Sequence, residues 1–357
     1  MAALEVHAGP RALRHLQREG WRAADIRVVP AAAGGPKGLV LVPLDRYLFG
    51  DWLSGEGPPL HLVGASIGAW RMAAACARDA DRALAEMAEL YVTQHYPHAP
   101  GRRPTARQVS RVFGGLLDQH LGPRAAEVLA HPRRRLHVVT SRGRHLLARD
   151  GRWRTPLGYA TAVFGNAVGR PALSAWLERV LWSDVRDALP IDLDDFRTRS
   201  EVLDAARLAR VVLASCSIPF WLEAVDDGLG PGAGTHWDGG LTDYHLHWRY
   251  GSMDQGLVLY PHFQPRLVPG WLDKPWRRRH AAGPALDNLV LLVPSARWVS
   301  SLPGAKLPDR NDFKAWAHDP PERIRRWRVA VAASQRLADE FGELVARNDV
   351  GTLRPLD

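Results

Sequence analysis

The sequence predicts an α/β fold in which a mostly parallel central sheet lies between two layers of helices. Two observations carry this prediction. The segment from Ile26 to Phe49 has the pattern of a short strand, a glycine-rich loop and a helix. The next segment, His61 to Tyr91, repeats that order with a strand, a tight turn and an alanine-rich helix. Strands that alternate with helices in this way are typical of parallel sheets covered on both faces.

The remaining elements are predicted from hydrophobic spacing and from glycine and proline positions. Helices are expected over residues 10–19, 39–49, 66–91, 203–214 and 312–347, and strands over 26–29, 61–64, 136–140, 145–148, 257–260 and 288–293. The uncharged run Thr155 to Gly169 and the apolar run Leu173 to Trp182 read as two buried helices. The alternative for these two runs is a wall or lid over an acyl chain.

We predict a single domain over residues 1–357, because the chain has no internal repeat and no linker-like stretch. A segment rich in Pro, Gly and Arg at 97–132 is a candidate insertion, and 312–347 forms a charged helical segment at the C-terminal end. Cys76 and Cys216 lie in apolar surroundings without paired spacing, which indicates reduced, buried thiols rather than a zinc site.

The charge balance favours anionic partners. The net charge is +9, and only four of the 47 basic residues are lysines. A surplus of this sign suits membrane head groups, nucleic acid or acidic substrates. No nucleic-acid-binding motif accompanies the charge, so no nucleic acid partner is expected.

The expected location is the cytoplasm, with peripheral contact to an anionic membrane surface. The first 21 residues carry charges throughout and lack the apolar core of a signal peptide, and no apolar run of about 18 residues is present. The segment His262 to His280 combines five basic residues with Trp271 and Trp276, a composition that suits a lipid interface. The alternative is a surface loop whose tryptophans pack back onto the core.

A candidate catalytic serine stands at the turn of the second unit. Residues 64–68 read Gly-Ala-Ser-Ile-Gly, a G-x-S-x-G pattern between strand and helix. In a nucleophile elbow, the glycines let the chain bend sharply and the helix N-terminus points its N–H groups at the serine. The same residue types also form ordinary strand-to-helix turns, so the pattern alone leaves both interpretations open.

A glycine-rich loop, residues 34–38, precedes this turn in the first unit. Its glycines would let backbone N–H groups approach an oxyanion closely. Pro36 has no N–H, so the candidate donors are Gly34, Gly35, Lys37 and Gly38, with Ile67 as a further one. Lys37 either holds the loop or meets a phosphate. A Walker A nucleotide loop would need Ser or Thr after the lysine, where Gly38 stands.

Four features in one order resemble the patatin-like phospholipase family. They are the Gly34–Gly38 loop, the Ser66 elbow, the segment Ala214-Ser215-Cys216-Ser217-Ile218-Pro219 and the turn Asp238-Gly239-Gly240. The family signatures are G-G-x-R/K-G, G-x-S-x-G, A-S-x-A/S-x-P and D-G-G or D-G-A. After Asp238-Gly239-Gly240 the family commonly continues towards Asn and Pro, whereas this chain has Leu241-Thr242-Asp243-Tyr244-His245. The resemblance spans about residues 26 to 245.

The resemblance implies a three-layer α/β/α patatin-like fold and a serine hydrolase of the phospholipase A or esterase type. Its substrate would be a lipid acyl ester, cleaved through an acyl-enzyme on Ser66. Asp238 would be the base without an intervening histidine. The oxyanion hole would be formed by Gly34, Gly35, Lys37 and Gly38, and the motifs would be supported by Gly64, Gly68, Gly239 and Gly240. No organic cofactor is implied.

Three alternatives stay open at this point. A Ser-His-Asp hydrolase could use Ser66 and Asp238 with a later histidine such as His262, His280 or His318. A lipid-binding protein could keep the fold without turnover, and an acyltransferase would use the same chemistry with another acceptor alcohol. His245 and His247 near Asp238 could form a metal cluster, but no third ligand has suitable spacing, so no metal is expected.

Overall fold

The computed structural model describes residues 2–98, 103–226 and 234–356. The described residues form one sheet of ten strands, in the order β10-β1-β9-β8-β2-β3-β4-β5-β6, with β7 paired to β4. The strands are β1 (Leu4–Ala8), β2 (Ile26–Ala31), β3 (Leu60–Ala65), β4 (Arg134–Gly143), β5 (Leu177–Ser183), β6 (Thr198–Val202), β7 (His236–Asp238), β8 (Leu257–Pro261), β9 (Leu289–Pro294) and β10 (Arg354–Pro355).

Most neighbouring strands of this sheet run parallel. The central strand β2 pairs in parallel with β3 and β8, β3 pairs in parallel with β4, and β8 with β9. Antiparallel pairing is confined to β1 with β9 and to β4 with β5 and β7. The carboxyl ends of β2 and β3 therefore lie at one edge of the sheet, which brings the loops that follow them together.

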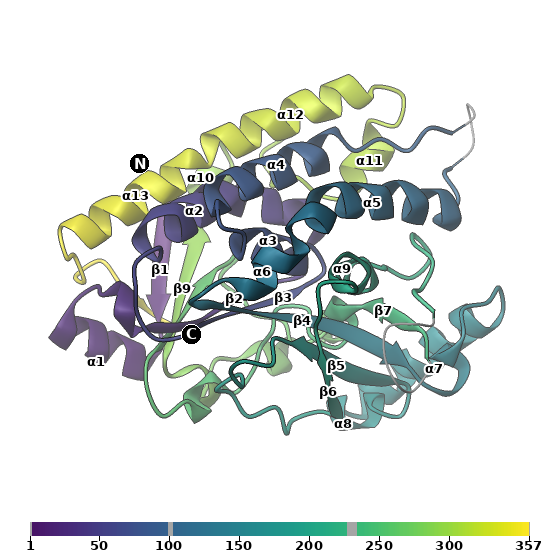
Figure 1. Cartoon of the computed structure of the whole chain (residues 1–357), viewed down its shortest axis with the longest axis horizontal. Coiled ribbons are helices and arrows are strands. Elements are labelled where there is room, and N and C mark those ends of the chain that lie inside the picture. Colours follow the sequence, from purple (N-terminus) through teal and green to yellow (C-terminus); the bar gives the residue numbers. More distant parts are fainter. Residues whose placement is uncertain (1, 99–102, 227–233, 357) are drawn as a thin grey trace.

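Helices flank the sheet, and α2, α4, α12 and α13 lie along one side of it (Figure 1). The α-helices are α1 (Pro10–Glu19), α2 (Val42–Tyr47), α3 (Ile67–Ala75), α4 (Ala80–Thr93), α5 (Ala106–Leu121), α6 (Ala125–Ala130), α7 (Arg154–Val168), α8 (Arg170–Leu173), α9 (Leu208–Ser215), α10 (Ala296–Val299), α11 (Asn311–Ala315), α12 (Pro320–Ala333) and α13 (Gln335–Ala346). The predicted fold class, α/β/α with a mostly parallel central sheet, is confirmed.

Several predicted elements differ from the structure. The predicted helix over 66–91 is two helices, α3 and α4, and the predicted helix over 312–347 is three, α11 to α13. The run Leu173 to Trp182 was predicted to be a helix, but its second half belongs to strand β5. This strand is buried on both faces, so its apolar residues do not alternate, and its charged residues Glu178 and Arg179 are buried in ion pairs. Residues 145–148 form a 3-10 turn instead of a strand.

The candidate insertion at 97–132 contains α5 and α6, while residues 99–102 lie outside the described part of the chain. Helix α5 packs on α9 and contributes Val109, Phe113 and Leu117 to the main hydrophobic core. Both cysteines are buried and unpaired, as predicted.

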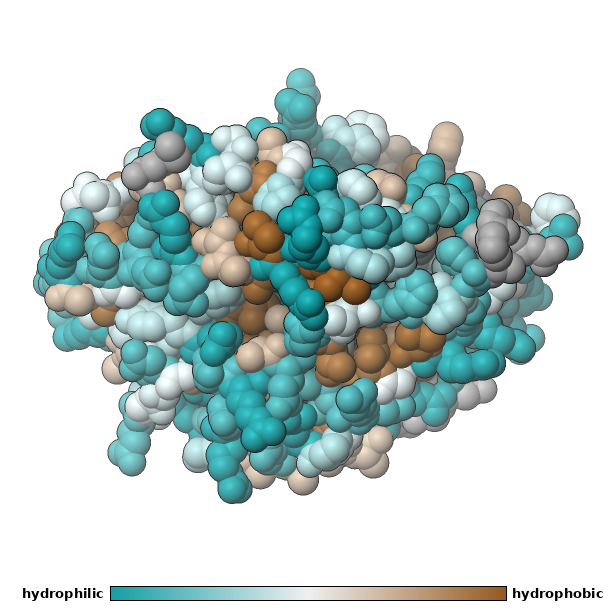
Figure 2. All heavy atoms as spheres, turned by 90° about the horizontal axis from the view of Figure 1, so that it is seen from above, coloured by the Kyte–Doolittle hydropathy of each residue, from teal (hydrophilic) through white to brown (hydrophobic). Residues whose placement is uncertain are grey.

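The surface on the helical side is largely hydrophilic, with hydrophobic patches near the middle of the view in Figure 2. Among the described residues, no helix is both long enough and apolar enough to cross a membrane.

A buried ion pair joins the helix after the glycine-rich loop to the helix after the serine turn. Arg71 on α3 donates to both carboxylate oxygens of Asp45 on α2, at 2.7 and 2.9 Å, and both side chains are fully buried. A bidentate pair of this kind restricts how the two helices can move relative to each other.

We expect Arg71→Met to lower the free energy of unfolding by about 3–5 kcal/mol, because it leaves Asp45 as a buried carboxylate without its partner. Guanidinium denaturation measures the change. The matched control is Arg46→Met on α2, whose ion pair with Asp81 is exposed and is worth less than about 1 kcal/mol. Equal losses in the two variants would show that the buried pair has no special role.

Candidate active site

Ser66 occupies a sharp turn between β3 and α3. Its backbone has φ 55° and ψ −128°, a conformation that non-glycine residues rarely adopt. The flanking glycines are required by close packing. A Cβ on Gly64 would lie 2.4 Å from the backbone of Gly68, and a Cβ on Gly68 would lie 2.0 Å from the carbonyl oxygen of Ala31 at the end of β2. The turn therefore has the geometry of a nucleophile elbow.

The structure brings Asp238 to Ser66 from the end of β7. The Ser66 hydroxyl donates to Oδ2 of Asp238 at 2.7 Å, and the Gly240 N–H donates to Oδ1 at 2.7 Å. Both side chains are buried. A Cβ on Gly239 would lie 2.2 Å from the carbonyl oxygen of Val139, so this position also has room only for glycine.

Burial raises the pKa of Asp238 to about 6. The hydrogen bonds from Ser66 and Gly240 act in the opposite direction, as do the positive charges of Arg310 and Lys274. A carboxylate with this pKa is ionised at neutral pH and can still accept a proton, the combination that a general base needs.

Ser215 holds the backbone of the elbow through its hydroxyl group. Its hydroxyl accepts a hydrogen bond from the Ser66 N–H at 2.9 Å and donates one to the carbonyl of Val139 on β4 at 2.6 Å. Ser215 belongs to the A-S-x-S-x-P segment, but the sequence pattern did not indicate what it contacts. The Ser215 side chain therefore links β4, α9 and the elbow, and it satisfies the buried N–H of Ser66 without a water molecule.

The four residues predicted as oxyanion donors separate into two groups. Gly34 and Gly35 line a pocket together with Ser66 and Asp238, and Gly35 has a positive φ of 56°. Lys37 and Gly38 line neither of the two pockets beside Ser66. The Lys37 ammonium lies over the ring of Phe263 at 5.4 Å, which favours the loop-holding interpretation of this residue.

Two pockets meet at Ser66. The first is lined by Ala33, Gly34, Gly35, Ser66, Ile218, Pro219, Asp238, Gly240, Leu241, Tyr244, Trp271 and Arg310. The second is lined by Gly35, Ser66, Ile67, Tyr91, Gln94, Tyr96, Val109, Phe113, Cys216, Ile218, Trp221, Leu222, Arg310 and Phe313. Aromatic and aliphatic side chains dominate the second pocket. Ser66 and Arg310 line both, so they lie at the junction.

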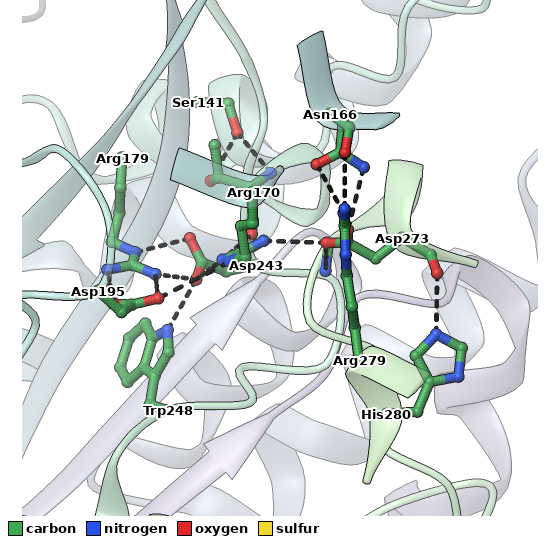
Figure 3. Close-up of polar contacts among 12 residues, drawn as sticks. Ser141, Asn166, Arg170, Arg179, Asp195, Asp243, Trp248, Asp273, Arg279 and His280 are labelled. Carbon is green, nitrogen blue, oxygen red and sulfur yellow. Dashed lines mark hydrogen bonds and ion pairs between the residues drawn. The ribbon is translucent and has the colours of Figure 1, made fainter. Parts of the chain in front are cut away.

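A buried ionic cluster holds the residues that follow Asp238-Gly239-Gly240 (Figure 3). Asp243 accepts hydrogen bonds from Arg179 at 2.6 and 2.8 Å and from the indole of Trp248 at 2.7 Å. Arg170 donates to the backbone carbonyl of Thr242 at 2.7 Å. Where the family commonly has other residues, this chain thus uses Asp243 to anchor the segment that follows Asp238.

The same cluster reaches the loop that carries Trp271 (Figure 3). The fully buried Asp273 accepts hydrogen bonds from Arg279 at 2.7 Å, Asn166 of α7 at 3.0 Å and the backbone N–H of Gly270 at 2.9 Å. Arg170 forms a further ion pair with Asp273 at 3.1 Å. One wall of the first pocket is therefore tied to α7 and α8 through Arg170, Asp273 and Arg279. Of these the sequence analysis counted only Arg279, among the basic residues of a possible lipid interface.

The histidines considered for a triad have partners other than Ser66 or are exposed. The ring of His280 bonds to the backbone carbonyl of Asp273, and that of His262 to the carbonyl of Gln264, while His318 is exposed. Burial lowers the pKa of His262 to about 3. Neither pocket is lined by a histidine of the described part of the chain. In that part, no three His, Cys, Asp or Glu side chains are grouped to hold a metal ion.

The match to a protein family agrees with the sequence resemblance. No curated protein sequence matches the chain. Several solved structures match the chain, and two of them are matched over most of its length. The crystal structure of VipD from Legionella pneumophila has a TM-score of 0.34 and 12% identity, and the match covers 95% of this chain and 70% of that one. Human GIVD cytosolic phospholipase A2 has a TM-score of 0.35 and 11% identity, with 96% and 65% covered. Residues 53–245, more than half of the chain, match the patatin-like phospholipase family, and the chain therefore belongs to that family.

Proposed function

We propose that this protein hydrolyses carboxylic ester bonds of lipids through an acyl-enzyme on Ser66, with Asp238 as the base. The hydrogen bond of 2.7 Å between the Ser66 hydroxyl and the Asp238 carboxylate is the observation that carries the proposal. A serine hydroxyl is a weak nucleophile until a base takes its proton during attack, and Asp238 is the group in contact with it.

The reaction would proceed in two halves. Ser66 Oγ attacks the ester carbonyl while its proton moves to Asp238, and the tetrahedral oxyanion is stabilised by N–H groups of Gly34, Gly35 and Ile67. Collapse of the intermediate breaks the ester bond, and the leaving alcohol takes the proton from Asp238. Water then attacks the acyl-enzyme while Asp238 again accepts a proton. Collapse of this second intermediate breaks the bond to Ser66 Oγ, which takes the proton from Asp238, and the fatty acid is released.

The second pocket supports an acyl chain as the part of the substrate bound beside Ser66. Its walls include Tyr91, Tyr96, Phe113, Trp221 and Phe313, a largely apolar surface. Such a pocket binds hydrocarbon by burying it from water and offers few polar contacts for a peptide or sugar. Acyl transfer to an alcohol other than water would use the same first half-reaction.

We also propose that the part of the 262–280 segment around Trp276 contacts an anionic membrane surface. Trp276 is 42% exposed, and the neighbouring Arg277 and Arg278 are exposed. Arg279 is instead held by Asp273 and by Asn166 of α7. Helix α7, joined to the segment in this way, carries exposed apolar side chains, among them Phe164 at 78% exposed. Rings and basic groups exposed together favour the lipid interface.

The pH dependence tests the base. Because the folded protein holds the pKa of Asp238 at about 6, we expect kcat/KM for a short-chain ester to fall about tenfold per pH unit below pH 6. The rate should be level from about pH 7 to pH 8. An acid limb centred near pH 4 would contradict the assignment, because it would correspond to a solvated carboxylate.

We expect Ser66→Ala to abolish ester hydrolysis and labelling by a fluorophosphonate probe. Asp238→Asn should lower kcat by about a thousandfold or more, because the amide is nearly isosteric but cannot accept the proton. The matched controls are His262→Gln and His280→Gln, which should keep most of the activity if they fold. Loss of activity in one folded histidine variant would favour a triad. A parent protein that neither turns over esters nor labels would be a lipid-binding protein.

For the membrane surface, we expect the double variant Arg277→Gln, Arg278→Gln to bind anionic vesicles about thirtyfold more weakly at low salt, since each basic group contributes about 1 kcal/mol. Vesicle sedimentation measures the change. The control is Arg14→Gln, Arg297→Gln, which removes the same charge from two other exposed arginines. Equal binding by all three proteins, or no binding by the parent, would reject this surface.

A further inference from the structure

Phe263 lies against the glycine-rich loop although it belongs to none of the family motifs. It stands outside the matched residues 53–245, two residues after strand β8, and β8 pairs in parallel with β2, the strand that leads into the loop. Because the carboxyl ends of neighbouring parallel strands lie at the same edge of a sheet, the fold brings Phe263 to residues 34–38. The sequence analysis treated its segment as a possible lipid interface, but Phe263 is buried, with 3% of its surface exposed.

The Phe263 ring interacts with the loop at two points. A Cβ on Gly34 would lie 2.5 Å from Cε1 of the ring and 2.7 Å from Cζ, so the ring occupies the space that a side chain at residue 34 would need. The Lys37 ammonium lies 5.4 Å from the centre of the same ring, a separation at which a cation is attracted to an aromatic face. Within residues 2–98, 103–226 and 234–356, this ammonium makes no hydrogen bond or ion pair. The ring therefore holds both ends of the turn that contains Gly35 and Pro36.

Neighbouring aromatic rings fix the position of Phe263. Its ring stacks on the imidazole of His262, with ring centres 4.4 Å apart and an angle of 25° between the planes. The imidazole of His245 meets it edge-on, at 5.3 Å and 85°. His245 is held in turn, because its Nδ1 accepts the Val268 N–H at 2.9 Å and its carbonyl accepts the Tyr260 hydroxyl at 2.7 Å. Phe263 also belongs to the main hydrophobic core, so the surface that it presents to the loop is a rigid one.

The residue before the loop has a separate attachment. The Ala33 N–H donates to the Tyr244 carbonyl at 2.9 Å, and a Cβ on Gly240 would lie 2.7 Å from the Cβ of Ala33. These contacts fix the point at which the loop begins. The contact with Phe263 starts one residue later, at Gly34, which is the first of the proposed oxyanion donors. The ring therefore acts on the donors themselves.

We propose that Phe263 is a positioning residue for the oxyanion hole. Its ring, packed against Gly34 and attracting the Lys37 ammonium, keeps the N–H groups of the loop directed at the ester oxygen that becomes negative during attack. The inference rests on the proposed ester hydrolysis at Ser66. Glycine gives a backbone little conformational preference of its own, so the orientation of a loop with three glycines has to come from its neighbours. Oxyanion donors stabilise the transition state most when they are oriented before the reaction begins.

The test compares two ketones as inhibitors of p-nitrophenyl butyrate hydrolysis, 1,1,1-trifluoro-2-hexanone and 2-hexanone. With the trifluoromethyl ketone, Ser66 Oγ bonds to the carbonyl carbon, the hydroxyl proton passes to Asp238, and the carbonyl oxygen takes the negative charge, as in the tetrahedral intermediate. The methyl ketone has nearly the same shape but stays a ketone. The measured quantity is the Ki of 2-hexanone divided by the Ki of the trifluoromethyl ketone.

We expect Phe263→Leu to lower this ratio about tenfold and to lower kcat/KM for the butyrate ester by the same factor, because losing one oxyanion donor outright costs about a hundred- to a thousandfold. The Ki of 2-hexanone should not change, since it does not depend on an oxyanion. Lys37→Met removes the cation from the ring without removing the ring, and it should lower the ratio about two- to fivefold.

Phe341→Leu is the matched control. Phe341 is a fully buried ring that packs on Trp21 and Trp52 and lines neither pocket beside Ser66, and its replacement removes the same atoms from the core. Its ratio should equal that of the parent. If Phe263 only stabilised the fold, both variants would lose active protein, but the two Ki values would stay unchanged because each Ki refers to the folded enzyme.

An unchanged ratio in Phe263→Leu would overturn the proposal. An equal rise in both Ki values would overturn it too, because the ring would then shape the pocket and not the oxyanion hole. If Phe263→Leu does not fold, an unchanged ratio in Lys37→Met rejects the proposal. A parent protein that does not hydrolyse the butyrate ester, or that binds both ketones equally, would reject the proposed hydrolysis at Ser66 and this inference with it. The positioning role can therefore fail while ester hydrolysis stands.

Discussion

The close approach of helix α3 to the ends of strands β2 and β3 is the constraint on which the candidate site depends. The backbone of Gly68 packs against the carbonyl of Ala31, and that of Gly64 against Gly68, at distances that leave no room for a Cβ. This contact lets the chain reverse its direction within one residue. At the reversal, Ser66 adopts a positive φ, which is a strained backbone conformation for a residue other than glycine. The hydroxyl consequently reaches Asp238 at the end of β7, and Ser66 shares a pocket with Gly34 and Gly35 of the loop that follows β2.

Holding that strained turn requires supports on several sides. The Ser215 hydroxyl satisfies the Ser66 N–H, and the buried pair of Arg71 with Asp45 joins α3 to the helix behind the glycine-rich loop. Asp243, bound by Arg179, fixes the segment that begins at Asp238. Each support places a polar or charged group in the interior, where desolvation is unfavourable unless hydrogen bonds are complete. Burying these groups lowers the stability of the fold, but together they fix the distance between Ser66 and Asp238.

The sequence allowed prediction of the parts that only a few residue types can form. A turn without room for a Cβ requires glycine, so Gly64, Gly68 and Gly239 left a readable pattern, and the strand-loop-helix order followed from hydrophobic spacing. Strand β5 was missed because burial on both faces removes alternation and because Glu178 and Arg179 look like surface residues until their partners are known. Arg310 could not be recognised from the sequence as a site residue, because one arginine among many becomes a candidate only when the fold places it in the same pockets as Ser66.

The position of Arg310 and Lys274 also bears on the strength of the proposed base. Their charges lower the pKa of Asp238, whereas burial raises it, and the result is a pKa of about 6. Because burial and these positive charges act in opposite directions, the loops that carry Arg310 and Lys274 help to set how readily Asp238 accepts a proton, although neither residue belongs to the family motifs.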